Sequence, residues 1–257
     1  MIKGRVFSFW CFIAVTIVVF WAIYTARRGR QVKVRAIPAL DAIPEAVGRS
    51  VEMGRPVVFN LGIADIIGDT AAQTLAGLGV LSYVAGLCAD YDTRILVPIT
   101  KPNVLPLAEE TVRTAYFTKG KLDKYDPNWI QYLSDEQWAY VSGVMGMTQR
   151  EKPGACILVG GFWSETLMVV ECANSVGAIQ IGGTGQLPQV PFFVAACDYA
   201  LIGEEIYAAR AVVSQDVQSL GSIDGQDLVK LISIILIVAG IALSTFGSSW
   251  LVNITKL

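Results

Sequence analysis

Two glycine-rich stretches are the strongest candidates for binding chemistry in this sequence. In the first, Gly160 and Gly161 follow an apolar run, and Ser164 precedes the next helical pattern. We predict a strand, a tight turn and a helix start, where free backbone N–H groups and the Ser164 hydroxyl could hold an anion. The alternative is that the glycines only form the turn and the serine only caps the helix. Phe162 and Trp163 are too bulky for a usual phosphate cradle, but they could stack on a planar ligand or a neighbouring subunit.

The second stretch places three glycines within four residues, a composition that permits close backbone approach to a ligand. No lysine follows, so the phosphate-binding pattern G-x-x-x-x-G-K-[ST] is absent. Pro188 and Pro191 prevent a helix from starting at once, which weakens the case for an anion at a helix terminus. Loop geometry alone remains the alternative for this stretch. Its residues are Gly182, Gly183, Thr184 and Gly185.

Carboxylates add one further candidate to these two stretches. Asp198 is predicted to close a strand, which is a common place for a site residue, but it could equally cap the following turn. Glu171 lies on an apolar helix, and we expect it at a rim or in a structural hydrogen bond, because a buried carboxylate needs partners. The remaining acidic residues show no spacing typical of a metal site, so we predict neither a metal nor a cofactor.

The composition excludes several function classes. The 257 residues include no histidine, which rules out Ser-His-Asp and Cys-His catalysis and histidine-ligated metals. The formal net charge is −2, so no overall basic field indicates a nucleic-acid partner. The five cysteines show no CxxC pair, and the four outside the apolar N-terminal run lie in apolar sequence, where we predict core packing.

Two long uncharged runs indicate membrane anchoring, and the mean hydropathy of +0.51 agrees with this. The C-terminal run, 231–252, has about 22 residues, enough for a helix to cross a hydrocarbon core of roughly 30 Å. Within it, Gly240, Ser244 and Ser248 recur at every fourth position. Such a small-residue stripe allows two membrane helices to approach closely, although small residues are also simply common in such helices.

The N-terminal run, 8–24, is predicted to be a retained anchor. The residues after it are bulky or basic, in contrast to the small residues of a signal-peptidase site. Basic residues are more numerous after this run than before it, which predicts a two-pass protein with a cytoplasmic domain and both termini outside. The opposite orientation is the alternative. Membrane lipid is therefore an expected partner.

The segment between the anchors alternates strand-like and helical patterns. This alternation predicts an α/β fold, a Rossmann-like doubly wound, mostly parallel sheet between two transmembrane helices. The expected domains are the anchor at 1–30, the α/β domain at 36–225 and the C-terminal membrane helix at 228–253. The expected strands are 56–61, 94–99, 155–159, 178–181 and 191–197.

Helices are expected between these strands. Ser134 with Gln137 forms a capping-box pattern that predicts a helix start, and the polar stretch 118–129 before it reads as a surface loop. The expected helices are 40–54, 70–88, 103–117, 134–150, 164–175 and 201–213, and a last one that begins near 221 and continues into the membrane run.

The stretches 36–62 and 158–205 together resemble an uncharacterised family of prokaryotic membrane proteins, a domain of unknown function. The resemblance covers nearly the whole segment from Ala36 to Leu231. It implies that the α/β domain and its terminal membrane helix form a recurring unit. It brings no activity, cofactor or catalytic residue to any position of this chain.

Two functions from different classes follow from these observations. The first is a non-enzymatic structural or scaffolding protein that forms a homo-oligomer or a multi-subunit membrane complex. The absence of histidine and of any complete catalytic motif favours it. The alternative is a sensor or enzyme that binds a nucleotide or small anion at the glycine stretches 160–164 and 182–186, placed where α/β sheets bind ligands.

Overall fold

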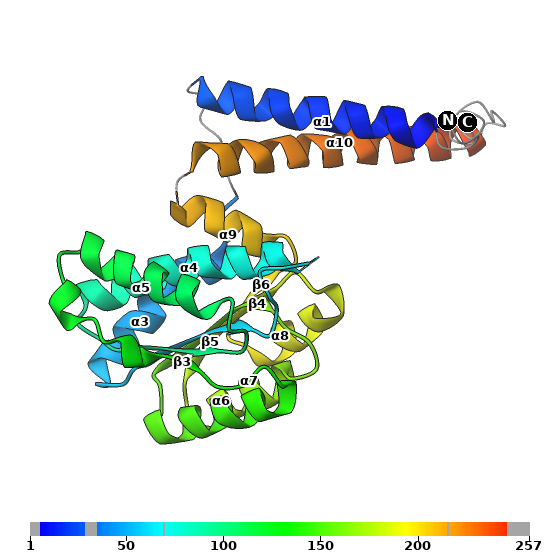
Figure 1. Cartoon of the computed structure of the whole chain (residues 1–257). Coiled ribbons are helices and arrows are strands. Elements are labelled where there is room, and N and C mark those ends of the chain that lie inside the picture. The colour runs from blue at the N-terminus through cyan, green and yellow to red at the C-terminus, as the bar shows by residue number, and fades with distance from the viewer. Residues whose placement is uncertain (1–5, 29–34, 69, 215, 246–257) are drawn as a thin grey trace. The chain divides into compact units, whose positions relative to one another are not determined.

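The computed structural model describes residues 6–28, 35–68, 70–214 and 216–245 (Figure 1). The chain divides into two compact units. One comprises Arg35–Ser214, and the other combines Met1–Val34 with Gln215–Leu257. The predicted domain boundary at 225 lies inside the long helix α10 (Val217–Thr245), which belongs to the second unit.

The Arg35–Ser214 unit is built on a six-stranded parallel sheet with strand order β3-β2-β1-β4-β5-β6. This order reverses between β1 and β4, as in doubly wound folds that bind dinucleotides. The α/β prediction with a parallel sheet is therefore confirmed. The strands are β1 (Val57–Gly62), β2 (Ile95–Ile99), β3 (Ile130–Tyr132), β4 (Ala155–Gly161), β5 (Ile179–Thr184) and β6 (Tyr199–Ile202).

Helices cover both faces of the sheet, which explains why its central strands are apolar throughout. Alternate residues of β1 enter different cores, with Phe59 on one face and Val58 on the other. Figure 1 shows α3, α4 and α5 on one face and α6 and α7 on the other. The helices are α2 (Pro38–Asp41), α3 (Ile43–Glu52), α4 (Ala71–Asp90), α5 (Leu105–Thr118), α6 (Gln137–Glu151), α7 (Thr166–Ser175), α8 (Val190–Ala196) and α9 (Glu205–Ser214), with short 3₁₀ turns at Leu122–Lys124, Pro127–Trp129 and Leu187–Gln189.

Among the described residues, three helices are long and apolar enough to cross a membrane: Ser8–Arg27, Ala71–Asp90 and Val217–Ala242. Their burial separates them. In the Ala71–Asp90 helix, 61% of the apolar window is buried, against 11% and 6% in the other two. We therefore assign α4 to the core of the α/β domain, where it packs against β1 and β4.

The predicted strand at 191–197 is wrong, because this segment forms helix α8. Pro191 occupies the first turn of α8, where its fixed φ suits a helix and its missing N–H costs nothing. Phe193 alone points into the core and meets Phe162 edge-on, with ring centroids 5.3 Å apart. The final strand follows instead as β6, in part of the segment predicted to begin a helix at 201.

The glycine stretches were predicted as turns, but most of their glycines lie in strands. Gly160 and Gly161 are the last residues of β4, and Gly182 and Gly183 lie inside β5. Other parts of the chain pack closely against these glycines, at distances that a side chain would not allow. The predicted polar loop is followed by the short edge strand β3, whose three residues are too few to give a sequence signal.

The start of α6 also differs from the prediction. Glu136 is its N-cap and accepts a hydrogen bond from the backbone N–H of Ala139. The Ser134 hydroxyl instead accepts from the Glu136 N–H, one turn before the helix. A carboxylate and a hydroxyl compete for the same role, and the charged acceptor also interacts favourably with the helix dipole.

The second unit contains helix α1 (Val6–Arg27) packed antiparallel against α10. Ala22 and Ala26 of α1 are buried against Gly221 and Gly225 of α10. A Cβ atom at Gly221 would lie 2.9 Å from Ala26 Cβ, so the close contact requires glycine. Gly240 of the predicted small-residue stripe faces open space. The Ser244 side chain and Ser248 lie outside the described residues, so the packing role of this stripe stays a prediction.

Candidate functional site

The point at which the strand order reverses, between β1 and β4, is where this architecture binds its ligands. The carboxyl ends of β1 and β4 meet there, and the chain continues from them into the segments 63–68 and 162–165. The first predicted glycine stretch lies at this edge. Whether a ligand can approach depends on what fills the space beside the glycines.

The chain itself occupies the space beside the first glycine stretch. A Cβ atom at Gly160 would lie 2.0 Å from the carbonyl oxygen of Leu61, and one at Gly161 would lie 2.3 Å from Ala64 Cβ. On the facing strand, Gly62 has a φ of +77°, and a Cβ there would lie 2.1 Å from the Gly161 oxygen. Glycine is needed here because two backbones cross closely.

The second stretch is closed in the same way. A Cβ atom at Gly182 would lie 2.1 Å from the Phe193 ring, and one at Gly183 would lie 2.5 Å from Leu201 Cβ. Beyond the strand, the Gly185 N–H donates to the side chain of Gln73 at 3.2 Å, and the Thr184 hydroxyl donates to the same oxygen at 3.3 Å. These four residues therefore serve strand packing and the contact with α4.

A buried polar network, which sequence analysis missed, lies under this edge. The Asn60 side-chain oxygen accepts a hydrogen bond from the Tyr140 hydroxyl at 2.7 Å and another from the Gly62 N–H at 2.7 Å. Thr100 donates to the Gly62 carbonyl at 2.9 Å. Tyr140 is fully buried, and burial raises the pKa of its hydroxyl well above the ordinary value, so the tyrosine stays neutral and donates. The Asn60 Nδ2 atom is buried without a hydrogen-bond partner.

Glu165 is the second residue that sequence analysis missed, and its side chain is fully buried. One carboxylate oxygen accepts from the Trp163 N–H at 3.0 Å, and the other accepts from the Gln137 amide at 2.7 Å. Gln137 also donates to Ser164 at 3.0 Å. Glu165 is the N-cap residue of α7, where the helix dipole favours negative charge. The group ties the start of α6 to the start of α7.

Asp198 lies apart from the glycine stretches. It precedes β6 and therefore lies at the amino edge of the sheet, the edge opposite to Gly160 and Gly161. Its carboxylate accepts a hydrogen bond from the Gln180 N–H at 2.7 Å, which joins β5 to the start of β6. A hollow of about 320 Å³ adjoins it and is also lined by Glu45, Arg49 and Tyr199. The expectation that Asp198 closes a strand is thus corrected: it opens one.

The other sequence candidates lie on outer surfaces or in the core. Glu171 is exposed on the rim of a hollow between α6 and α7, as expected. Cys88, Cys156 and Cys172 are buried. Burial raises the pKa of Cys88 and Cys156 and raises that of Cys197 to about 12, so these three thiols are neutral and poor nucleophiles at neutral pH.

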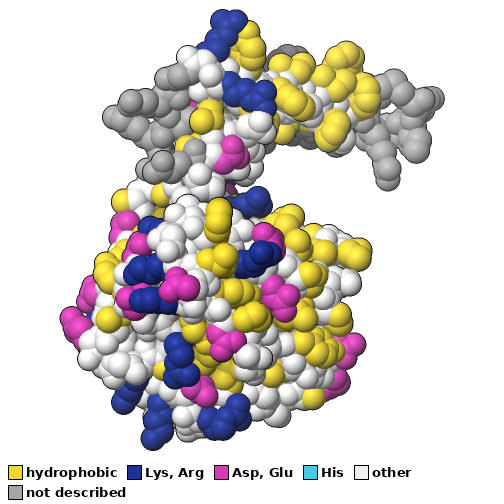
Figure 2. Space-filling model, turned by 60° about the vertical axis from the view of Figure 1, so that its left-hand side comes forward, with side chains coloured by type: hydrophobic (Ala, Val, Ile, Leu, Met, Phe, Trp, Pro, Cys, Tyr) yellow, Lys and Arg dark blue, Asp and Glu magenta, His cyan; other side chains and the backbone are white. Residues whose placement is uncertain are grey.

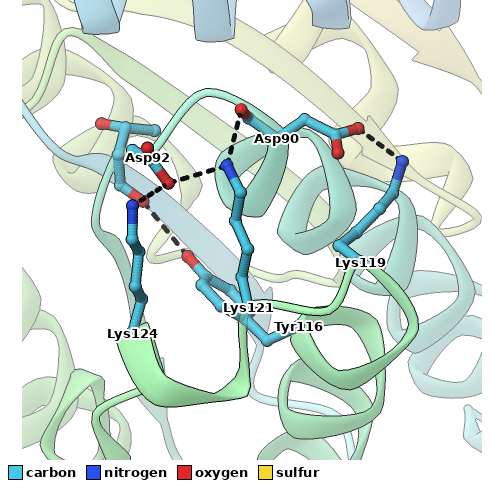
Figure 3. A network of polar contacts seen from close by, with 7 residues as sticks. Asp90, Asp92, Tyr116, Lys119, Lys121 and Lys124 are labelled. Carbon is cyan, nitrogen blue, oxygen red and sulfur yellow. Dashed lines mark hydrogen bonds and ion pairs between the residues drawn. The ribbon is translucent and has the colours of Figure 1, made fainter.

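A second polar cluster lies at the amino edge, where α4 turns into β2 (Figure 3). Asp92 accepts from Lys121 at 2.8 Å and pairs with Lys124 at 2.7 Å, while Asp90 pairs with Lys119. Hydrogen bonds from Lys121 and then Lys124 lower the pKa of Asp92. Every side chain of the cluster is partly exposed. The pairs fasten the α4–β2 turn to the segment after α5.

Neither edge presents an open catalytic arrangement among the residues that the structure describes. Within that part of the chain, no three His, Cys, Asp or Glu side chains are grouped to hold a metal ion. At the carboxyl edge, the polar groups bond chiefly to one another, and the glycines pack against protein atoms. The arrangement holds helix starts and strands in place.

Comparison with known proteins gives one match. The sequence model of a family described as a domain of unknown function matches residues 1–255. Searches of curated proteins and of solved structures found no match. The match confirms the resemblance to an uncharacterised family.

Proposed function

Because the chain belongs to the family described as Domain of unknown function (DUF6754), which brings no activity, we propose a function from the geometry alone. The protein is a membrane-anchored structural subunit that assembles with further copies of itself. Its α/β domain carries one contact between copies, and its helical hairpin, α1 with α10, fixes the assembly to the membrane. No catalytic step is part of this proposal.

The observation that carries the proposal is a set of exposed apolar side chains on and around β6. Four large apolar side chains are exposed there: Leu187 to 75%, Val194 to 54%, Ile202 to 52% and Tyr199 to 39%. Leu187 reaches to 4.0 Å from the Cβ position of Gly203, directly after β6. We call these four residues the β6 edge patch. Exposed apolar patches of this kind are typical of protein contacts.

The position of β6 strengthens this argument. It is the terminal strand of the sheet, so one of its sides has no neighbouring strand. Such edges attract further strands, and proteins that stay monomeric usually protect them with charged residues or a bulge. The exposed apolar residues of β6 are Tyr199 and Ile202, on opposite faces of the sheet, and one charged group, the Glu205 carboxylate, accepts from the Ile202 N–H at 2.9 Å. A two-fold axis beside β6 would bring the same patch of two copies together.

The hairpin surface supports the membrane part of the proposal. Figure 2 shows hydrophobic side chains over much of the described surface of this unit, whereas charged side chains are spread over the α/β domain. On α1, Phe12 is 70% exposed, and on α10, Ile241 is 64% exposed. Large apolar side chains exposed along two long helices suit lipid. With two passes and the basic flank after α1 inside, the α/β domain lies in the cytoplasm.

The packing around the glycines is the reason for placing ligand binding second. Its glycines were expected to permit close backbone approach to a ligand, and the space where their Cβ atoms would lie is taken by Leu61, Phe193 and Leu201. The remaining candidate of that kind is Ser164, which is exposed and accepts one hydrogen bond from Gln137. We therefore favour assembly over nucleotide or anion binding.

The test is the mass of the full-length protein, extracted gently and kept in lipid nanodiscs, measured by native mass spectrometry. We expect a defined homo-oligomer. Ile202→Lys should weaken it, because a charge is placed within the β6 edge patch. The matched control is Ile67→Lys, since Ile67 is also apolar and 71% exposed but lies in the loop after β1. A wild-type protein that is a monodisperse monomer would contradict the proposal.

The same preparation tests the alternative function. Under the assembly proposal, neither a nucleotide nor inorganic phosphate raises the melting temperature. A rise that Ser164→Ala abolishes would move the function to ligand binding at the start of α7. Ser164 suits this test better than Gly183, because a side chain at Gly183 would clash with Leu201 whether or not a ligand binds.

A further inference from the structure

The contact between α1 and α10 fixes how far each helix is shifted along the other. Gly221 lies opposite Ile23 and Ala26, and Gly225 lies opposite Val19 and Ala22. A step of four residues along α10 thus matches about four residues along α1 in the opposite direction, at 1.5 Å per residue. This register can be extended to the other residues of the pair.

Extended in this way, the register places charged residues of α10 beside the uncharged run of α1. Lys230 lies beside about position 15 of α1, and Asp227 beside about position 18. The candidate span of α1 is Ser8–Arg27. If the α1 span sets the position of a hydrocarbon core of roughly 30 Å, Lys230 lies near its middle and not at its border, where the 231–252 run would place it. Ionised side chains at this depth are strongly unfavourable unless protein or water faces them.

These charged residues lie on the side of α10 that is turned away from α1. Gly221 and Gly225 face α1 and are buried, whereas the Asp227 and Lys230 side chains are 65% and 44% exposed. They form an ion pair with each other at 3.0 Å. Gln226 and Ser233 are exposed as well, and the spacings 226, 230 and 233 place them along one face of the helix.

We propose that this polar face of α10, formed by Gln226, Asp227, Lys230 and Ser233, is the contact between copies of the chain within the membrane. Copies inserted in the same direction bring their α10 helices together in parallel. Asp227 of one copy then lies within reach of Lys230 of its neighbour, because the two positions are one helical turn apart. The two residues can then pair between copies as well as within one helix, and the charges are removed from lipid.

A second copy is the occupant for two reasons. The face carries one acidic and one basic residue, so it complements itself, whereas a partner with a single sign of charge would repel one of them. The contact also uses the face that the α1 pairing leaves open. This inference rests on the proposed function, since it requires a membrane-inserted assembly of identical chains.

The proposed contact is tested by exchanging the acidic and the basic residue between two variants of the chain. Full-length chains carrying Asp227→Lys or Lys230→Asp are produced separately and then together with two different affinity tags. Each variant alone should associate at least tenfold more weakly, equivalent to about 1.4 kcal/mol, because its faces carry like charges. Together they should form a mixed oligomer in which both tags are recovered. The pair within each helix stays broken in this mixture, so recovery reports contacts between copies only.

A neutral variant tests the contact even if the charge variants fail to insert into the membrane. Asp227→Asn with Lys230→Gln introduces no repulsion and suits lipid better, yet it should also associate more weakly than wild type. The controls are Asp90→Lys and Lys119→Asp, made in separate chains. Each breaks an exposed ion pair of the α/β domain and should leave assembly unchanged.

The outcomes separate the two proposals. If wild type is oligomeric and the neutral variant assembles as wild type does, the polar face of α10 is not the contact and this inference fails alone. Recovery of no mixed oligomer from two folded charge variants also overturns it. If wild type is a monomer, the proposed function fails and this inference fails with it.

Discussion

The two edges of the central sheet carry polar clusters that differ in burial, and the difference shows what each cluster can contribute. At the carboxyl edge, Asn60, Tyr140 and Glu165 are buried, and their bonds join β1, α6 and α7. At the amino edge, Asp90 and Asp92 bond to lysines across a partly exposed surface. Water competes for the second set of bonds and is excluded from the first.

This difference matters for function because the buried cluster occupies the edge at which such sheets usually bind ligands. At this edge a ligand would have to replace contacts that the chain makes with itself, and among the groups of the cluster only Asn60 Nδ2 has no hydrogen-bond partner in the part of the chain that the structure describes. The exposed edge could accept new partners, but its charges are already paired. Three substitutions test this contrast, beginning with the one of largest expected effect.

Gly62→Ala should cause the largest loss. Position 62 has a φ of +77°, which alanine adopts only with strain, and the added Cβ would lie 2.1 Å from the Gly161 oxygen, so β1 and β4 must separate. We expect about 3 kcal/mol or more of lost unfolding free energy, measured by thermal or chemical denaturation.

The matched control is Gly48→Ala in α3, where a Cβ has nothing within 4 Å. This change should stabilise by up to about 1 kcal/mol through helix propensity. If Gly62→Ala were instead tolerated without loss, the carboxyl edge would have room that a ligand could use, and the contrast between the edges would fail.

Tyr140→Phe should have an intermediate effect. It removes the hydroxyl that donates to Asn60 and leaves that buried oxygen with one donor fewer. The expected cost is about 1–2 kcal/mol, seen as a fall in melting temperature of roughly 3–6 °C. Tyr132→Phe is the control, because Tyr132 is 42% exposed and water can hydrate its hydroxyl. Equal falls in melting temperature for the two changes would show that the buried network stabilises the fold no more than an exposed hydroxyl does.

Asp92→Asn should have the smallest effect. Asparagine also tolerates the left-handed backbone at this position, where φ is +54°, so only the ion pairs are lost. At neutral pH we expect the melting temperature to fall by less than about 2 °C. A larger fall would mean that the amino edge is as important to stability as the carboxyl edge.

The pH dependence of this difference has a definite sign. Lys121 and Lys124 lower the pKa of Asp92 in the folded state, so the ion pairs stabilise the fold above the ordinary value of about 3.9. The contribution is lost as the pH falls through the lowered value. Melting curves of wild type and variant should therefore converge in acid and differ near neutrality.

Most of the framework could be predicted from local sequence. The apolar runs at β1, β2, β4 and β5 and the helical patterns between them identify an α/β domain, because both sheet faces are covered and strands must be apolar throughout. The failures have local causes. Pro191 and the aromatic residues after it form an apolar run that is typical of a strand. In the structure this run is helix α8, and Phe193 is its only buried residue.

The candidate site was predicted less well, because its meaning depends on residues far apart in the chain. The sequence locates Gly160 and Gly161 after an apolar run, but the atoms beside them belong to Leu61 and Ala64. Asn60 and Tyr140 are 80 positions apart, so their hydrogen bond leaves no local pattern. Glu165 reads as an ordinary helix-start residue until its burial is known.

The sequence by itself determined the fold class, the two lipid-compatible helices and the absence of histidine chemistry, since hydrophobic periodicity, run length and composition are properties of the chain. Tertiary structure decided that the glycines serve close backbone contacts, that Gly221 and Gly225 join α10 to α1, and that Asp227 and Lys230 face outward. These features depend on which residues, distant in the sequence, are in contact in the folded chain. Glycine permits close approach to a strand, a helix or a ligand equally, so only the fold selects among them.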